Sequence, residues 1–240
     1  MQRRVFVFWT GSNPMSPARQ RSLAAMTATD CPVVLVTAEN LHDYIAADEI
    51  HPAYPYLNLA HRADYLRCHF MLRHGGGYAD LKPVGASWRA AFDRLEGDAE
   101  LWAVGYPEIG PRGVANLYQS SRVLGTGALA QARAWLEWKQ LRRNHRRLIG
   151  LCAFVFRPDT PLARSWWAEL NHRLDRLLPA LQANPARSPR ERPGELVDGS
   201  PSRYPVPWTH LLGDIFHPLV ARHHRHVDRS LPAPGFTDYL

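Results

Sequence analysis

Lysine is scarce in this sequence of 240 residues, which has it only at positions 82 and 139. The formal net charge of +7 therefore rests almost entirely on arginine. A basic surface attracts anionic partners such as nucleotide sugars, acidic polysaccharide, lipid phosphate or nucleic acid. The overall composition does not choose among these partners, so the choice has to come from local motifs.

Cysteine is equally sparse, with Cys31, Cys68 and Cys152 far apart in the chain and no pair spaced as C-x-x-C. This pattern suggests neither a disulfide framework nor a zinc site built from thiolates. We expect all three cysteines to be small buried residues.

Long hydrophobic runs are missing too, since no stretch approaches the roughly 20 apolar residues of a membrane-spanning helix. The apolar segment 5–9, behind a charged start, is too short for the core of a secretion signal and fits a first strand. No transmembrane segment is therefore expected, and the sequence predicts a cytoplasmic protein.

Hydrophobic residues make up 45% of the chain, enough for one α/β domain spanning residues 1–240. A buried strand at 5–9 precedes a helix that starts at Ser16-Pro17 and runs to about residue 28, and a valine-rich strand follows at 32–37. This order favours a mainly parallel sheet with crossover helices on its faces.

The rest of the chain continues the alternation of helices and strands. Residues 184–207 are rich in Pro, Arg, Ser and Gly, hold little that can be buried, and are expected to form a mobile surface loop that closes as a lid. Pro218 is expected to kink or restart the last helix. The periodicity predicts helices at 59–73, 88–95, 129–147, 160–181 and 208–216 and strands at 78–80, 101–105 and 150–156.

The most informative segment is His74-Gly75-Gly76-Gly77-Tyr78-Ala79-Asp80-Leu81-Lys82-Pro83, directly after the helix at 59–73. Glycines let the backbone approach a ligand closely. The short strand then delivers Asp80, and Lys82 follows two residues later. One acid, one amine and bare backbone suit a diphosphate better than a neutral ligand.

Asp64 and Arg67 lie three residues apart on the preceding helix and are neighbours on its surface. On spacing alone they fit an exposed salt bridge worth less than about 1 kcal/mol, and a glycine run can simply end a helix. The combination is more specific, because it brings Asp64, Arg67 and Asp80 to one strand end. Ligands of open α/β sheets bind outside the carboxyl ends of strands.

These residues resemble a known family. Ala63-Asp64-Tyr65-Leu66-Arg67 followed by Gly75-Gly76-Gly77-Tyr78-Ala79-Asp80 is similar to the A-D-x-x-R…G-G-x-Y-x-D-x-D signature of the DXD-containing sugar-binding region in glycosyltransferases related to family 32. Capsular-polysaccharide transferases, yeast mannosyltransferases and the glucosylating clostridial toxins share this signature. The resemblance covers residues 57–83, and Val7-Phe8-Trp9-Thr10-Gly11 is similar to the family's first-strand W-x-G.

The resemblance implies a GT-A type, Rossmann-like nucleotide-sugar-binding fold and a retaining, hexosyltransferase-like reaction, with Mn²⁺ or Mg²⁺ as the usual cofactor of the family. It implies that Asp64 and Arg67 hold donor sugar hydroxyls and that Asp80, the first DXD acid, touches the ribose or a metal-bound diphosphate. The other positions that it implies at the donor are Trp9, Thr10 and Gly11 against the base, with Gly76, Gly77 and Tyr78 nearby.

Lys82 departs from the signature, because it occupies the position of the second DXD acid, normally a metal ligand. A charged ammonium group does not ligate a metal ion and repels it. Either Lys82 replaces the metal and neutralises the β-phosphate as it leaves, or the site binds a donor without chemistry. We favour replacement, since a preorganised cation stabilises leaving-group charge. No metal is then required, and Asp80 is a metal ligand only if one is used.

The segment from Tyr204 to Pro218 holds two further candidates. Trp208 and His217 are expected to close over the diphosphate, as the C-terminal segment of this fold often does. Core packing is the alternative for Trp208, and a helix end without function is the alternative for His217. The expected catalytic residues are therefore Asp80, Lys82 and His217.

Three functions are compatible with these features. The leading hypothesis is a bacterial glycosyltransferase of polysaccharide biosynthesis, which moves a sugar from a nucleotide-sugar donor, UDP-sugar ahead of GDP-sugar, to a carbohydrate hydroxyl. The second is a non-catalytic nucleotide-sugar-binding protein. The third is a transferase acting on nucleic acid or protein, in keeping with the basic charge.

Overall fold

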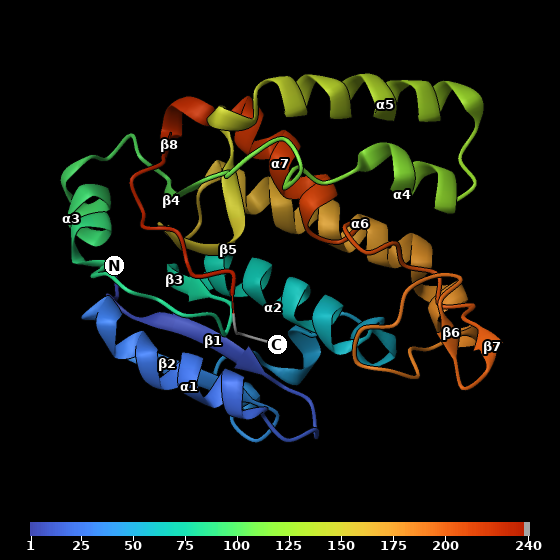
Figure 1. Ribbon diagram of the computed structural model, residues 1–240, viewed down its shortest axis with the longest axis horizontal. Coiled ribbons are helices and arrows are strands. Elements are labelled where there is room, and N and C mark those ends of the chain that lie inside the picture. The colour runs from blue at the N-terminus through green and yellow to red at the C-terminus, as the bar shows by residue number, and fades with distance from the viewer. Residues whose placement is uncertain (238–240) are drawn as a thin grey trace.

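The computed structural model describes residues 1–237 and has a six-stranded sheet with helices on both faces (Figure 1). The strands of this sheet are β1 (Val5–Trp9), β2 (Val33–Thr37), β3 (Gly76–Ala79), β4 (Ala103–Pro107), β5 (Ile149–Phe156) and β8 (Val227–Asp228). The helices are α1 (Pro17–Ala25), α2 (Leu59–Arg73), α3 (Arg89–Gly97), α4 (Leu117–Val123), α5 (Ala128–Arg143), α6 (Pro161–Ala183) and α7 (Gly213–Arg222). A separate hairpin pairs β6 (Leu196–Val197) with β7 (Ser200–Pro201).

The strand order in the sheet is β2-β1-β3-β5-β4-β8. β1 pairs in parallel with β2 and β3, and β4 pairs in parallel with β8. β5 runs antiparallel to both of its neighbours, β3 and β4. The predicted α/β class with a helix-covered sheet is therefore confirmed, and the sheet is mixed because one strand is reversed.

β1 shows why both faces of the sheet need covering helices. Successive strand residues point to opposite faces, so Phe6 and Phe8 enter one core while Val5 and Val7 enter the other. On the first face, the rings of Phe6 and Phe8 each lie 4.9 Å from that of Phe70 in α2. Buried side chains of α6 and α7 belong to the same core. The second face is covered by residues from α1 and α3.

Several boundaries differ from the sequence expectation. Ser16 caps α1 as predicted, accepting from the Arg19 amide at 3.3 Å, but the helix ends at Ala25 and a 3-10 turn, Met26–Thr29, completes the segment. The last helix begins at Gly213, not at residue 208, and continues through Pro218. The carbonyl that proline leaves unbonded there, that of Asp214, accepts instead from Arg173 at 3.5 Å.

The segment 184–207 buries more than its composition suggests. The side chain of Glu191 is fully buried, and Tyr204 and Val206 lie in the core. The Asn58 amide group, at the start of α2, donates to the Glu191 carbonyl at 2.9 Å. The expectation of little burial is therefore wrong for these residues, and the segment is tied to the end of α2 that lines the cavity described below. Among residues 1–237, no helix is long and apolar enough to cross a membrane.

Candidate functional site

A cavity of about 490 Å³ opens where β1 and β3 reach their carboxyl ends. Because both strands are parallel, the segments that follow them meet at the same edge of the sheet. The cavity is lined by Trp9, Thr10 and Gly11 after β1, Asp64 and Arg67 of α2, Tyr78, Asp80 and Lys82 in and after β3, Leu151 and Cys152 of β5, and Trp208, Thr209, Leu212 and Gly213 before and at the start of α7.

Asp64 and Arg67 point from one turn of α2 into this cavity. Asn58 caps the helix by accepting from the His61 amide at 2.7 Å, which fixes where the first turn begins. The Arg67 guanidinium lies 3.2 Å from the Asp64 carboxylate, and the two side chains are only 8% and 10% exposed. An exposed salt bridge is therefore excluded, and this pair is a buried one whose charges need full compensation.

Arg67 is the cation at the centre of the site. Its guanidinium also lies 3.4 Å from Asp80, and its Nη1 donates to the Leu151 carbonyl at 2.8 Å. It stacks over the ring of Tyr78, 4.4 Å from the ring centroid. One buried side chain thus joins α2, β3 and β5, so the geometry of both acids depends on it.

Both carboxylate oxygens of Asp80 have polar partners. The Tyr78 hydroxyl donates to Oδ1 at 2.6 Å, and the Lys82 ammonium lies 3.2 Å from Oδ2. Burial alone would raise the pKa of Asp80, but Arg67, Lys82 and the Tyr78 hydroxyl outweigh it and hold this pKa below its ordinary 3.8. Asp80 is therefore ionised at neutral pH and oriented before any ligand arrives.

Lys82 is buried, with only 7% of its surface exposed. Its ammonium group donates to the Cys152 sulfur at 2.7 Å and lies 5.0 Å from the centre of the Phe236 ring. Burial lowers the pKa of Lys82, but the Asp80 carboxylate and Cys152 more than offset this, so the pKa is raised above 10.5. Lys82 is therefore a fixed positive charge in the cavity wall.

Asp64 differs from Asp80 in its protonation. Burial raises the pKa of Asp64 from 3.8 to about 7, with Arg67 opposing the rise and the nearby Asp80 charge adding to it. An acid whose pKa is raised on folding stabilises the folded state fully below its unfolded pKa, and this contribution is lost as the pH rises through the folded value. The contribution of Asp64 is thus lost between about pH 4 and about pH 7.

We therefore expect Asp64→Asn to change how the free energy of unfolding depends on pH. Relative to the variant, the native chain should lose stability between about pH 4 and about pH 7. Urea unfolding across that window measures the difference. Burial lowers the pKa values of His61, His69 and His217 to about 4. These histidines make the free energy of unfolding rise with pH in both proteins, so their effect cancels in the comparison. A difference that stays constant across the window would contradict a raised pKa for Asp64.

Two of the predicted donor residues, Gly76 and Gly77, lie outside the cavity lining. Gly76 has a φ of +84°, and a Cβ there would lie 2.9 Å from the Arg4 carbonyl. At Gly77 a Cβ would lie 3.1 Å from both Trp88 and Val5. These glycines allow close packing around β3, and their placement outside the lining does not fit the predicted contact with a donor.

His217 also lies away from the cavity. Its side chain is fully buried in α7, where Nδ1 accepts from the Ala115 amide at 3.1 Å and Nε2 lies 3.7 Å from Glu108. Burial lowers the pKa of His217 to about 4, so it is neutral. The prediction that His217 reaches a donor phosphate does not fit this placement, because the helix turns its ring into the core.

Trp208 lines the cavity as predicted. Two arginines that were not predicted from the sequence lie over its ring. The Arg192 and Arg190 guanidiniums lie 4.3 Å and 5.5 Å from the centre of its ring. Arg19, at the start of α1, lines the same cavity and donates to the Leu81 carbonyl at 2.6 Å. The sequence signal for Arg19 is the helix start at Ser16-Pro17. It follows β1 closely and so puts the first turn of α1 near the carboxyl end of that strand.

A divalent metal does not fit the donor set of this cavity. The acids in its lining are Asp64 and Asp80, and both pair with Arg67, while Lys82 takes the second oxygen of Asp80. A dication would have to displace these cations. Within residues 1–237, no cluster of three or more His, Cys, Asp or Glu side chains could hold a metal ion.

Comparison with protein-family models, with curated proteins and with solved structures found no match to this chain.

Proposed function

We propose that this chain is a GT-A type glycosyltransferase, which binds a nucleotide-sugar donor, UDP-sugar foremost, and transfers the sugar to a carbohydrate hydroxyl. One observation carries the proposal. Trp9, Asp64, Arg67 and Asp80, which belong to three separate parts of the sequence and carry the resemblance to sugar-nucleotide enzymes, line one cavity at the carboxyl ends of parallel strands. The Rossmann-like alternation around β1, β2 and β3 supports the same proposal.

The positive charge of the cavity lining suits a diphosphate. Arg19, Arg67 and Lys82 line it, and its two acids are paired with Arg67 or Lys82. In the proposed reaction the bond between the sugar carbon and the diphosphate oxygen breaks while the acceptor oxygen bonds to that carbon. The acceptor proton passes to the departing diphosphate. Lys82 stabilises the negative charge on the leaving group, which is the task of a metal ion in DXD enzymes.

Binding without transfer is the second candidate, and one observation favours it. Asp80 is held between Arg67 and Lys82, and Asp64 faces Arg67, so among residues 1–237 each carboxylate of the lining already has a cationic partner in place of an acceptor hydroxyl. A transferase of this kind has to rely on the donor's own phosphate as the base. A binding protein has no such requirement.

Release of UDP from a panel of UDP-sugars, with and without an oligosaccharide acceptor, separates the two candidates. A transferase is expected to release UDP slowly with water and faster with a suitable acceptor, and Asp80→Asn should reduce the release by at least about 10²-fold through loss of donor positioning. Thermal stabilisation by the same donors without UDP release in either condition would favour the binding protein. If the donors neither stabilise the protein nor release UDP, both candidate functions are contradicted.

A further inference from the structure

Helix α5 lies at the outer edge of the molecule, farthest from β1 and β2, and packs on α4 and α7 (Figure 1). Its packed side is narrow: Leu141 is its one fully buried side chain, and Ala134 and Trp138 are partly buried against the core. These positions are spaced by three or four residues, so they form a single stripe. Gln131 and Arg142 are half-buried beside this stripe, and the other residues of this helix of 16 are exposed.

The outward side of α5 carries large apolar side chains. Leu129 is 80% exposed, Leu136 is 60% exposed and Trp135 is 42% exposed. Leu129 and Leu136 are seven residues apart, which places them on one face of the helix, opposite the packed stripe. With Val123 at the end of α4, this region supplies four of the eight large hydrophobic side chains that are exposed within residues 1–237.

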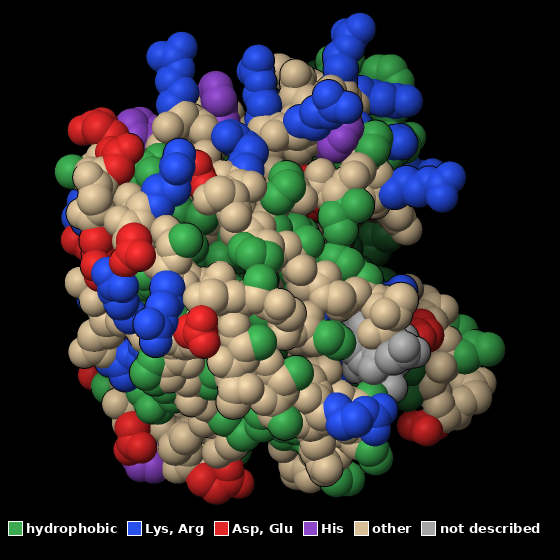
Figure 2. Space-filling view, turned by 60° about the vertical axis from the view of Figure 1, so that its left-hand side comes forward, with side chains coloured by type: hydrophobic (Ala, Val, Ile, Leu, Met, Phe, Trp, Pro, Cys, Tyr) green, Lys and Arg blue, Asp and Glu red, His purple; other side chains and the backbone are tan. Residues whose placement is uncertain are grey.

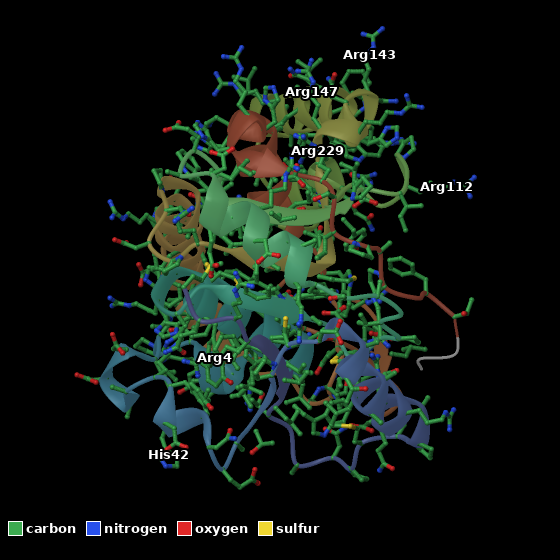
Figure 3. All side chains as sticks on the ribbon, turned by 90° about the vertical axis from the view of Figure 1, so that its left-hand side faces the viewer. Arg4, His42, Arg112, Arg143, Arg147 and Arg229 are labelled. Carbon is green, nitrogen blue, oxygen red and sulfur yellow. The ribbon has the colours of Figure 1, made fainter. Side chains whose placement is uncertain are left out.

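The same surface is strongly basic. Glu137 is the single acid between residues 128 and 147, against six basic side chains. Figure 3 shows Arg143 and Arg147 reaching outward from this end of the molecule, and Figure 2 shows Lys and Arg side chains projecting along the same edge. The six are Arg133, Lys139, Arg142, Arg143, Arg146 and Arg147.

We propose that α5 is a docking helix for an anionic lipid surface, lying flat in the headgroup region with Leu129 and Leu136 inserted and Trp135 at the flank of the inserted face. An exposed basic helix with leucine and tryptophan on its outer face has the chemistry of such interfacial helices, in which apolar burial and attraction to anionic headgroups act together. This inference goes beyond the donor site and does not depend on it, because no cavity residue lies on α5.

Two other occupants fit the surface less well. A second copy of the chain packed across the same face would bring the basic side chains of both copies, Arg133, Lys139 and Arg143 among them, into one interface, which is repulsive. Nucleic acid would neutralise the basic side chains but would leave Leu129 and Leu136 in water or against phosphates. A membrane surface satisfies both the charge and the apolar side chains.

Co-sedimentation with lipid vesicles tests the proposal on the full chain. The protein is expected to bind vesicles made of equal parts phosphatidylcholine and phosphatidylglycerol, to bind pure phosphatidylcholine vesicles at least about tenfold more weakly, and to be released by salt. Combining Leu129→Ser with Leu136→Ser should weaken binding by about tenfold or more, as should Arg133→Glu combined with Arg143→Glu. These side chains are exposed, so the variants should keep their thermal unfolding midpoint.

Matched controls make the result specific to α5. Leu196→Ser, at a side chain 72% exposed in the β6–β7 hairpin, and Arg176→Glu, at an exposed residue of α6, are expected to leave vesicle binding unchanged. The proposal is overturned if anionic vesicles are not bound, or if the control variants lose as much binding as the α5 variants. It is also overturned if the leucine substitutions dissociate a dimer in sedimentation velocity, or if duplex DNA binds and the leucine substitutions do not affect vesicles. UDP binding measured on the same variants should not change. A failure of the lipid-docking proposal can therefore be told apart from a failure of the proposed donor site.

Discussion

Arg67→Met is expected to lower the free energy of unfolding by about 3–5 kcal/mol, the usual consequence of removing one partner from a buried ion pair. Methionine can fill much of the space, but it leaves the Asp80 carboxylate without its central cation and the Leu151 carbonyl without its donor. Asp64 would lose its cation as well. Urea unfolding near neutral pH measures the loss, and UDP binding should disappear with it.

The matched control for this variant is Arg164→Met, which breaks an exposed ion pair with Asp159 on the surface. Little change in unfolding is expected there, because solvent screens exposed pairs. Adding Asp64→Asn to Arg67→Met should recover part of the lost stability, since one buried acid is then neutral in either state. An Arg67→Met protein as stable as the Arg164→Met protein would show that the guanidinium does not compensate the two acids.

Lys82 carries the second large effect, on the chemistry of the site. Lys82→Met should reduce release of UDP from a UDP-sugar by about 10²–10³-fold, the scale seen when one preorganised group that stabilises transition-state charge is removed. Lys82→Asp should abolish UDP binding in EDTA and regain it with Mn²⁺, because two carboxylates would then stand two residues apart, as in a DXD motif. Isothermal titration of UDP in the two buffers measures this exchange of a built-in cation for a metal.

Lys139→Met is the control for these variants, because it removes the chain's other lysine from exposed α5 and should leave UDP binding and release unchanged. Thermal unfolding of the Lys82 variants separates a lost charge from a lost fold. Full turnover by Lys82→Met would mean that the ammonium group is structural, and that Arg67 and Arg19 alone stabilise the leaving diphosphate.

Much of the fold could be predicted from the sequence where the signals are local. Helix α2 has the predicted bounds, because its apolar stripe is continuous and the glycine run ends it. β1 and β2 have near-predicted bounds for the same reason: each is a short apolar run between turns. The reversed direction of β5 could not be predicted, since it depends on pairing with β3 and β4, which are distant in sequence.

The site was predictable in part, because its position follows from the order of strands and helices. The rule that ligands bind at the carboxyl ends of parallel strands brings Asp64, Arg67 and Asp80 together without coordinates. Their spacing on α2 does not tell a buried pair from an exposed one, because the covering groups come from β5 and from the turn before α7. His217 was misplaced because nearness to Trp208 in sequence does not give the direction of a side chain on α7.

Calorimetric titration of UDP into the unmodified protein, once in EDTA and once in Mn²⁺, tests the central claim most directly. If Arg67, Lys82 and Arg19 supply the positive charge that a diphosphate needs, UDP should bind in EDTA with an affinity that Mn²⁺ changes by less than about threefold, and uridine without phosphates should bind far more weakly. Binding that requires Mn²⁺, or no binding of UDP in either buffer, would contradict a nucleotide-diphosphate site whose cation is built into the chain.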